Sequence, residues 1–261
     1  MVVDMELNKI HNKSSESMVE IADGSIDLIV TSPPYNIDIQ YGNKWEKGRS
    51  IGSKGEKYED NLSEEGYKNL LSSVFKECSR VLKDKGSFYL NMKSKYVNGN
   101  LIPPFWFLEL LNDFYLKNII IWNFDWGGST NKRFASRYEF VLFLTKNKKE
   151  WVFNLDDVKI PSLNYRPDRY KSQLKNPTDV WKIPIVSGNS KERTSHPAQF
   201  PEKLIERIIK ASTNPEDIVL DPFIGSGTTA IVSKRLDRKY LGYDTNSDYV
   251  KIANKRINDE N

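Results

Sequence analysis

Hydrophobic positions along the chain fall into short unbroken runs and into longer segments with helical spacing. The short runs, whose length favours buried strands, cover residues 27–30, 87–92, 117–124, 139–145, 217–220 and 239–243. Helical spacing, with apolar side chains three or four positions apart, marks residues 64–83, residues 105–112 and the segments that begin at Pro201 and Ala230. Because runs and helical segments alternate, the sequence predicts a three-layer α/β fold built on one sheet. No internal repeat divides the chain, so residues 1–261 are expected to form a single domain.

Two long stretches lack this periodicity, residues 36–60 and residues 146–190. The first is polar, with several glycines and lysines, and loops of this length are usually functional or disordered. We expect either a mobile loop that closes over a bound molecule or a disordered insertion.

Basic and aromatic residues are concentrated in the second stretch. Residues 146–175 hold eight basic and four acidic side chains, so their net charge equals the +4 of the whole chain. Basic groups neutralise phosphates, and arginine can also contact base edges. Arg166, Arg169 and Lys171 are therefore candidate nucleic-acid contacts, although a solvated loop face would also be charged. Arg133 and Arg137, next to a Trp-Gly-Gly segment, are further candidates for phosphate contacts, with local pairing to carboxylates as the alternative.

The polar segment Thr31-Ser32-Pro33-Pro34-Tyr35 directly follows the first apolar run. Proline fixes φ at about −65° and has no backbone N–H, so the carbonyls of Ser32 and Pro33 can accept hydrogen bonds in set directions. The Tyr35 ring can stack on a base, which is worth roughly 1–3 kcal/mol. The segment therefore suits a flat base held by its exocyclic amine, although an ordinary proline-rich turn has the same composition.

Residues 221–229, Asp-Pro-Phe-Ile-Gly-Ser-Gly-Thr-Thr, join a predicted strand to a predicted helix. Glycines let the backbone approach a ligand, and a helix N-terminus supplies free N–H groups. Asp244 ends the next strand, roughly 20 residues on, where an acid binds ribose hydroxyls in nucleotide-binding folds. A phosphate-binding P-loop is absent, and Ala230 occupies the place of the third glycine of the dinucleotide fingerprint. The segment predicts a nucleoside-type ligand, with a tight turn as the alternative.

Composition excludes several other classes of protein. A single cysteine, Cys78, excludes an intramolecular disulfide and a Cys-x-x-Cys zinc site, and with only two histidines no metal site is expected. No apolar run approaches the length of a membrane span, and the first residues show no signal-peptide pattern, so a cytoplasmic protein is expected. The small positive net charge permits nucleic acid as a partner without requiring it.

Together, the Ser-Pro-Pro-Tyr segment and residues 221–229 resemble the amino-group DNA methyltransferases. Their order, catalytic segment first and cofactor segment last, is similar to the circularly permuted β group of that family. Residues 137–144, 176–181 and 195–204 resemble its linking segments, so the resemblance covers most of the chain. It implies a Rossmann-like, three-layer α/β/α methyltransferase fold, with a mostly parallel sheet and one antiparallel strand near Phe140.

The resemblance also implies a function. The chain is expected to transfer a methyl group from S-adenosyl-L-methionine to the exocyclic amine of a base flipped out of double-stranded DNA. The implied catalytic residues are Ser32, Pro33, Pro34 and Tyr35. The implied cofactor-binding residues are Asp221, Pro222, Phe223, Gly225, Ser226, Gly227, Thr228, Thr229, Asp244, Phe200 and Pro201. Residues 146–190 become the expected target-recognition region, and a companion restriction endonuclease and a homodimer are expected by analogy with relatives.

Alternatives remain at this point. Family members with serine at the position of Ser32 mostly methylate the N4 amine of cytosine, which is favoured here, and the N6 amine of adenine is the alternative. A catalytically silent DNA-binding module is a hypothesis of another class, but both motifs are intact. RNA methylation ranks lower because no RNA-binding motif is evident. His196 and Cys78 are expected to be structural.

Overall fold

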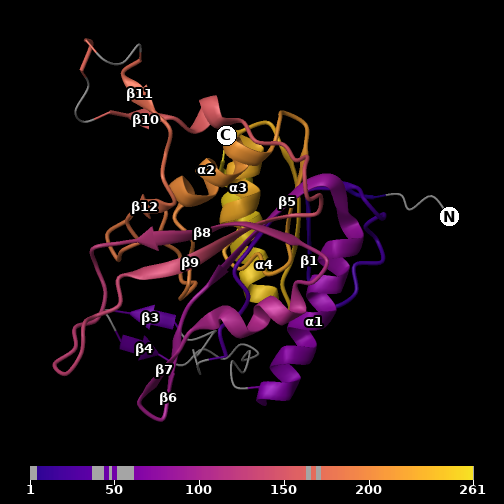
Figure 1. Ribbon diagram of the computed structural model, residues 1–261. Helices are drawn as coiled ribbons and strands as arrows, with labels where there is room; N and C mark the ends of the chain where they lie inside the picture. The colour runs from indigo at the N-terminus through magenta and orange to yellow at the C-terminus, as the bar shows by residue number, and fades with distance from the viewer. Residues whose placement is uncertain are drawn as a thin grey trace.

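A computed structural model describes residues 5–36, 44–46, 49–51, 62–162, 166–168 and 172–260. Within these ranges one large sheet forms the centre of the molecule, with its strands in the order β1-β14-β13-β2-β5-β9-β8-β12 (Figure 1). The strands are β1 (Lys9–His11), β14 (Lys239–Tyr243), β13 (Ile218–Asp221), β2 (Ile26–Thr31), β5 (Leu82–Met92), β9 (Tyr138–Thr145), β8 (Tyr115–Asn123) and β12 (Val180–Lys182).

The sheet is parallel from β1 through β5, whereas β9 runs antiparallel to both of its neighbours. The expected antiparallel strand near Phe140 is thereby confirmed. Val219 of β13 pairs with Leu28 of β2, so two strands far apart in the sequence are neighbours in the sheet. Since parallel strands end at the same edge, the polar segments that follow β2 and β13 lie side by side there.

Helices cover both faces of the sheet. Helix α1 (Glu64–Val81) and the 3₁₀ helix η1 (Pro104–Leu110) pack on one face, and α2 (Glu202–Ser212) and α3 (Thr228–Arg235) pack on the other, with α4 (Ser247–Asp259) against α3 and β1. Alternate side chains of a strand point to opposite faces. Ile29 of β2 accordingly joins the core under α1, and Leu28 joins the core under α2.

The hydrophobic pattern located most elements but missed some. The helix expected at 64–83 is α1, and Ser63 begins it by accepting a hydrogen bond from the Gly66 amide at 3.0 Å. In place of the helix expected at 105–112, the structure has the 3₁₀ helix η1, which begins one residue earlier and ends two residues earlier. Strands β1 and β12 were missed because each has only three residues. Helix α4 was also missed, although its buried residues Tyr249, Val250, Ala253 and Ile257 have helical spacing.

Short elements complete the described chain. They are β3 (Lys44–Glu46), β4 (Arg49–Ile51), β6 (Lys95–Val97), β7 (Asn100–Ile102), η2 (Leu155–Val158), β10 (Ile160–Pro161) and β11 (Leu174–Lys175). The β10–β11 pair projects away from the central sheet (Figure 1). The loop expected at residues 36–60 lies largely outside the described residues, apart from Asn36 and the backbones of β3 and β4. No helix in the described part has the length and apolar composition needed to cross a membrane.

The irregular stretch 146–190 begins at the amino ends of the parallel strands and returns to their carboxyl ends. Lys146 Nζ donates to the carbonyls of Ser79 and Leu82 at the end of α1, and the Asn154 amide donates to the Ala211 carbonyl at the end of α2. These contacts hold the beginning of the stretch at the edge opposite the ends of β2 and β13. Strand β12, parallel to β8, then brings the chain back to the edge where the motif segments lie.

Candidate active site

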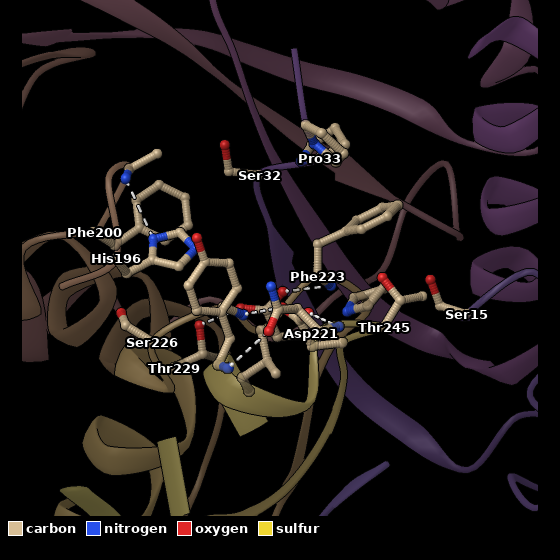
Figure 2. Close-up of a pocket in the computed structure, with 18 of the residues that line it drawn as sticks. Ser15, Ser32, Pro33, His196, Phe200, Asp221, Phe223, Ser226, Thr229 and Thr245 are labelled. Carbon is tan, nitrogen blue, oxygen red and sulfur yellow. Dashed lines mark hydrogen bonds between the residues drawn. The ribbon is translucent and has the colours of Figure 1, made fainter. Parts of the chain in front are cut away.

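A pocket opens at the carboxyl ends of β2, β13 and β14. It brings together most of the residues expected at a catalytic and cofactor site: Ser32, Pro33, Pro34, Tyr35, Phe200, Asp221, Pro222, Phe223, Gly225, Ser226, Thr228, Thr229 and Asp244. In Figure 2, Ser32 and Pro33 lie on one side of the pocket and Ser226 and Thr229 on the other, with Asp221 between them. Gly227 and Pro201 do not line the pocket. They are the residues that precede α3 and α2.

Asp221, at the end of β13, connects the two motif segments. Its carboxylate accepts hydrogen bonds from Thr31 Oγ1 at 2.7 Å, from Thr229 Oγ1 at 2.7 Å and from the Phe223 amide at 3.1 Å. The side chain is almost fully buried, and this burial raises its pKa to about 6 despite the three donors. Asp221 thus connects the end of β2, through Thr31, to the start of α3, through Thr229.

Asp244, at the end of β14, holds the glycine loop from the other side. Its carboxylate accepts from the Gly225 amide at 3.0 Å and from the Asn246 amide at 2.8 Å. Burial, together with a smaller effect of the neighbouring Asp221, raises the pKa of Asp244 to about 6. A carboxylate held in this way is positioned to accept hydrogen bonds from hydroxyl groups of a ligand in the pocket.

Two positions in the 221–229 loop accommodate only glycine. Gly225 has φ of +49°, and a Cβ there would lie 2.7 Å from His196 Nε2. Gly227 has φ of +81°, and its Cβ would lie 2.7 Å from the Cβ of Ala253 in α4. Both the left-handed backbone and the close packing require glycine.

His196 forms part of the pocket wall, a position that the sequence did not reveal. Its Nδ1 accepts a hydrogen bond from the Ala198 amide at 3.3 Å, and its ring packs edge-on against Tyr249. Burial lowers the pKa of His196 to about 4, so the imidazole is neutral at ordinary pH.

Other lining residues were not anticipated from the sequence: Lys13, Ser14, Ser15, Leu70, Ala198, Thr245, Asn246 and Tyr249. Those at positions 13–15 follow β1, whose short sequence carries no strand signal. Those at 245–249 directly follow Asp244, and their place could have been inferred from the carboxyl end of β14.

The Ser-Pro-Pro-Tyr segment is held by contacts on both sides. The Pro34 carbonyl accepts a hydrogen bond from Tyr67 Oη of α1 at 2.6 Å. Ser32 Oγ donates to Tyr35 Oη at 2.8 Å, and Tyr35 Oη donates to Glu139 Oε2 of β9 at 3.0 Å. Tyr35 lines the pocket, and its hydroxyl also belongs to a hydrogen-bond network that nothing in the sequence indicated.

A second, wider cleft begins where the first pocket ends. Ser32, Tyr35, Ala198 and Phe200 line both spaces. The cleft is otherwise bounded by the ends of β5, β8 and β9 and by the loop between β8 and β9. The Ser-Pro-Pro-Tyr segment therefore separates a narrow pocket from an open cleft, and a group at Ser32 can be reached from both.

The five basic residues expected to contact DNA have different positions. Arg133 and Arg137 line the wide cleft, where Arg133 stacks 4.0 Å from the Tyr96 ring centroid and Arg137 donates to the carbonyls of the Trp-Gly-Gly turn. Arg166 is exposed, lines neither space and forms an ion pair with Asp168 at 3.5 Å. Arg169 and Lys171 lie outside the described residues.

The described residues contain no cluster of His, Cys, Asp and Glu side chains that could hold a metal ion. Cys78 is buried on α1 in the core, as expected from its place on the apolar helix face.

Comparison with known proteins gives concordant results. The sequence model of a DNA methylase family matches residues 26–255. The Type II methyltransferase M.BglII of Bacillus subtilis is 39% identical, with the match covering 97% of this chain and 70% of that protein. M.HpaI of Haemophilus parainfluenzae is 34% identical over 98% of this chain and 76% of that protein. The DNA adenine methyltransferase YhdJ of Escherichia coli is 35% identical over 95% of this chain and 81% of that protein.

Among solved structures, the PvuII DNA methyltransferase (cytosine-N4-specific) superposes with a TM-score of 0.70 at 22% identity. The superposition covers 98% of this chain and 91% of that one. At this level of identity the likeness shows that the two chains share a fold.

Proposed function

The chain belongs to the N6/N4 family of DNA methylases, and we propose that it transfers a methyl group from S-adenosyl-L-methionine to the N4 amine of cytosine in double-stranded DNA. The observation that carries the proposal is the position of Ser32, which lies in the wall between a narrow pocket and an open cleft. A methyl donor on one side and a flipped base on the other would meet at this residue.

The narrow pocket has the chemistry that S-adenosylmethionine requires. Asp244 offers a partly buried carboxylate to the ribose hydroxyls, and the start of α3, near Ser226 and Thr228, offers N–H and O–H groups to the methionine carboxylate. Phe200 and Phe223 present apolar rings to the remainder. Gly225 lets this loop approach closely, since a side chain there would strike His196.

The catalytic segment would activate the amine by accepting its hydrogen bonds. An exocyclic amine is a poor nucleophile because its lone pair is delocalised into the ring. Ser32 Oγ and the Pro33 carbonyl can accept its N–H bonds and return electron density to nitrogen, while Pro34 and Tyr35 fix the segment. S-adenosylmethionine would supply an electrophilic methyl group at this point, with the thioether S-adenosylhomocysteine as the leaving group, and the methylated amine would release one proton to water in the open cleft. Catalysis in this scheme is positioning and electrostatics.

The wide cleft is the proposed site of the flipped base and the adjoining duplex. Arg133 and Arg137 at its border place positive charge where phosphates would lie. We further propose that the part of 146–190 that returns toward this edge reads the target sequence, with Arg166, Arg169 and Lys171 among its contacts. The loop at 36–60 would close over the bound base.

Serine at position 32 supports cytosine as the target. Adenine remains the second candidate, because a relative that is 35% identical is named a DNA adenine methyltransferase. The relatives named Type II methyltransferases support a role in a restriction-modification system. A companion endonuclease and a homodimer belong to the same proposal.

The base can be identified directly. Purified protein is incubated with unmethylated DNA and isotopically labelled S-adenosylmethionine, and the DNA is digested to nucleosides for mass spectrometry. Labelled N4-methylcytosine is the expected product. Methyladenine as the sole product would establish the second candidate, and no transfer to any DNA would favour a silent DNA-binding module. Ser32→Ala should sharply lower turnover while the affinity for S-adenosylmethionine stays unchanged.

A further inference from the structure

Glu139 enters the wide cleft from β9 and ends a chain of hydrogen bonds that starts at Ser32. The steps are Ser32 Oγ to Tyr35 Oη at 2.8 Å and Tyr35 Oη to Glu139 Oε2 at 3.0 Å. Asn91 of β5 supports both ends, because its Nδ2 donates to Tyr35 Oη at 2.6 Å and to Glu139 Oε2 at 2.8 Å. Four side chains from three elements thus converge beside the catalytic segment.

The chemistry of these groups sets the direction of the chain. A carboxylate only accepts hydrogen bonds and an amide NH₂ only donates them. Tyr35 must therefore direct its hydroxyl proton to Glu139, while its oxygen accepts from Asn91 and from Ser32. If Asn91 were turned over, its oxygen would face the carboxylate, so the amide orientation follows from the same rule.

The direction of the chain decides what Ser32 presents to the cleft. Its proton is committed to Tyr35. Asn91 Nδ2 makes a long hydrogen bond of 3.5 Å to Ser32 Oγ, so one lone pair of this oxygen remains for a group that arrives from the cleft. The Asn91 and Glu139 end of the network is largely shielded from water, since Asn91 is 2% exposed and the Glu139 side chain 13% exposed. At low dielectric, successive hydrogen bonds polarise one another, so the charge on Glu139 strengthens Ser32 as an acceptor.

We propose that Glu139 is a positioning residue that makes Ser32 a hydrogen-bond acceptor and thereby selects bases that carry an amine at the position of cytosine N4 or adenine N6. Cytosine N4 and adenine N6 are donors, whereas thymine or uracil O4 and guanine O6 are acceptors. An acceptor base would set its oxygen against the lone pairs of Ser32. The inference rests on the proposed function and adds to it the residue that sets the polarity of the site.

The first test is a change of charge without a change of shape. A glutamine side chain can donate as well as accept, so in Glu139→Gln the Tyr35 hydroxyl is free to turn and donate toward Ser32. Single-turnover methyl transfer should fall about 10- to 100-fold, which is the size expected for losing one charge-assisted hydrogen bond. The affinities for S-adenosylmethionine and for duplex DNA should stay within about twofold of the wild type. Glu150→Gln is the matched control, because Glu150 pairs with Lys85 at the opposite edge of the sheet.

A double-mutant cycle separates action through Tyr35 from an independent effect. If Glu139 acts through Tyr35, then Glu139→Gln should cost little in a Tyr35→Phe background, where the chain is already broken. Additive losses would overturn the proposal. So would unchanged turnover in Glu139→Gln, or an equal loss in Glu150→Gln.

A binding experiment tests the polarity without any chemistry. The target position is first mapped from the methylated bases of host DNA. Two duplexes are then prepared, one with cytosine and one with uracil at that position. The opposite strand is abasic there, so flipping either base out breaks no base pair. The wild type should bind the cytosine duplex at least about tenfold more tightly, and Glu139→Gln should bind the two about equally. Equal binding by the wild type would overturn the proposal. Absence of methyl transfer by the wild type would instead reject the proposed function. The binding comparison does not depend on methyl transfer, so the two failures can be told apart.

Discussion

Replacing Gly225 by alanine should damage both the stability of the protein and its pocket. The residue has φ of +49°, a region that costs an L-residue roughly 1–2 kcal/mol. The added Cβ would also lie 2.7 Å from His196 Nε2, and overpacking of this kind costs about 1–3 kcal/mol. The free energy of unfolding should therefore fall by about 2–5 kcal/mol.

Gly24 provides a matched control, because it shares the backbone conformation but has open space around it. Its φ is +57°, and a Cβ there would meet nothing within 4 Å. Gly24→Ala should lose only the backbone cost, roughly 1–2 kcal/mol, and should leave ligand affinity unchanged. Urea denaturation followed by tryptophan fluorescence measures both losses.

Isothermal titration calorimetry with S-adenosylmethionine tests the functional half of the prediction. Gly225→Ala must push His196 from its place in the pocket wall, so the affinity should fall at least about tenfold, or about 1.4 kcal/mol. In a His196→Ala background the same substitution should cost only the backbone penalty. If Gly225→Ala and Gly24→Ala proved alike in stability and in affinity, the close contact with His196 would have no energetic role.

Three further outcomes follow from individual contacts. Burial lowers the pKa of His196 to about 4, below its unfolded value near 6.5. The unfolded state therefore binds a proton more readily than the folded state, and the free energy of unfolding falls as the pH drops from about 6.5 to about 4. His196→Gln should therefore gain about 2 kcal/mol on the wild type between pH 8 and pH 5, measured by urea denaturation at both values. Tyr67→Phe leaves the Pro34 carbonyl without its donor at 2.6 Å and should lower the free energy of unfolding by about 1–3 kcal/mol. The methyl-transfer rate should fall more than the affinity for the cofactor. Equal losses would contradict a role of Tyr67 in holding the Ser-Pro-Pro-Tyr segment. Arg137→Lys removes the paired bonds to the Trp-Gly-Gly turn, and DNA affinity from fluorescence anisotropy should fall while cofactor affinity holds.

The elements that carry a strong local signal could be predicted from the sequence. Strand β14 matches its expected range, and α1 differs only at its C-terminal end, because buried runs and helical periodicity are local properties. Strand β1 could not be found in this way. It has three residues, and its pairing with β14 comes from the fold rather than from its own composition. The pocket residues that follow β1 were missed for the same reason.

The candidate site shows the same division between local and distant contacts. Asp221 and Asp244 could be selected because each follows a recognisable strand and belongs to a motif. The partners of Ser32 could not. Asn91 and Glu139 belong to apolar runs, where nothing local distinguishes them from other polar positions in strands. The pairing of β5 with β2 brings Asn91 to the Ser-Pro-Pro-Tyr segment, and the antiparallel pairing of β9 with β5 brings Glu139 there.

The order of the strands explains why one short segment can serve two ligands. Strand β2 lies between β13 on one side and β5 on the other. The segment that leaves β2 therefore meets Asp221 and the glycine loop on its β13 side, through the bond from Thr31. On its β5 side it meets Asn91 and Glu139, through Ser32 and Tyr35. A methyl donor and a methyl acceptor must approach a shared point from opposite directions, and a segment between two neighbouring strand ends provides that geometry.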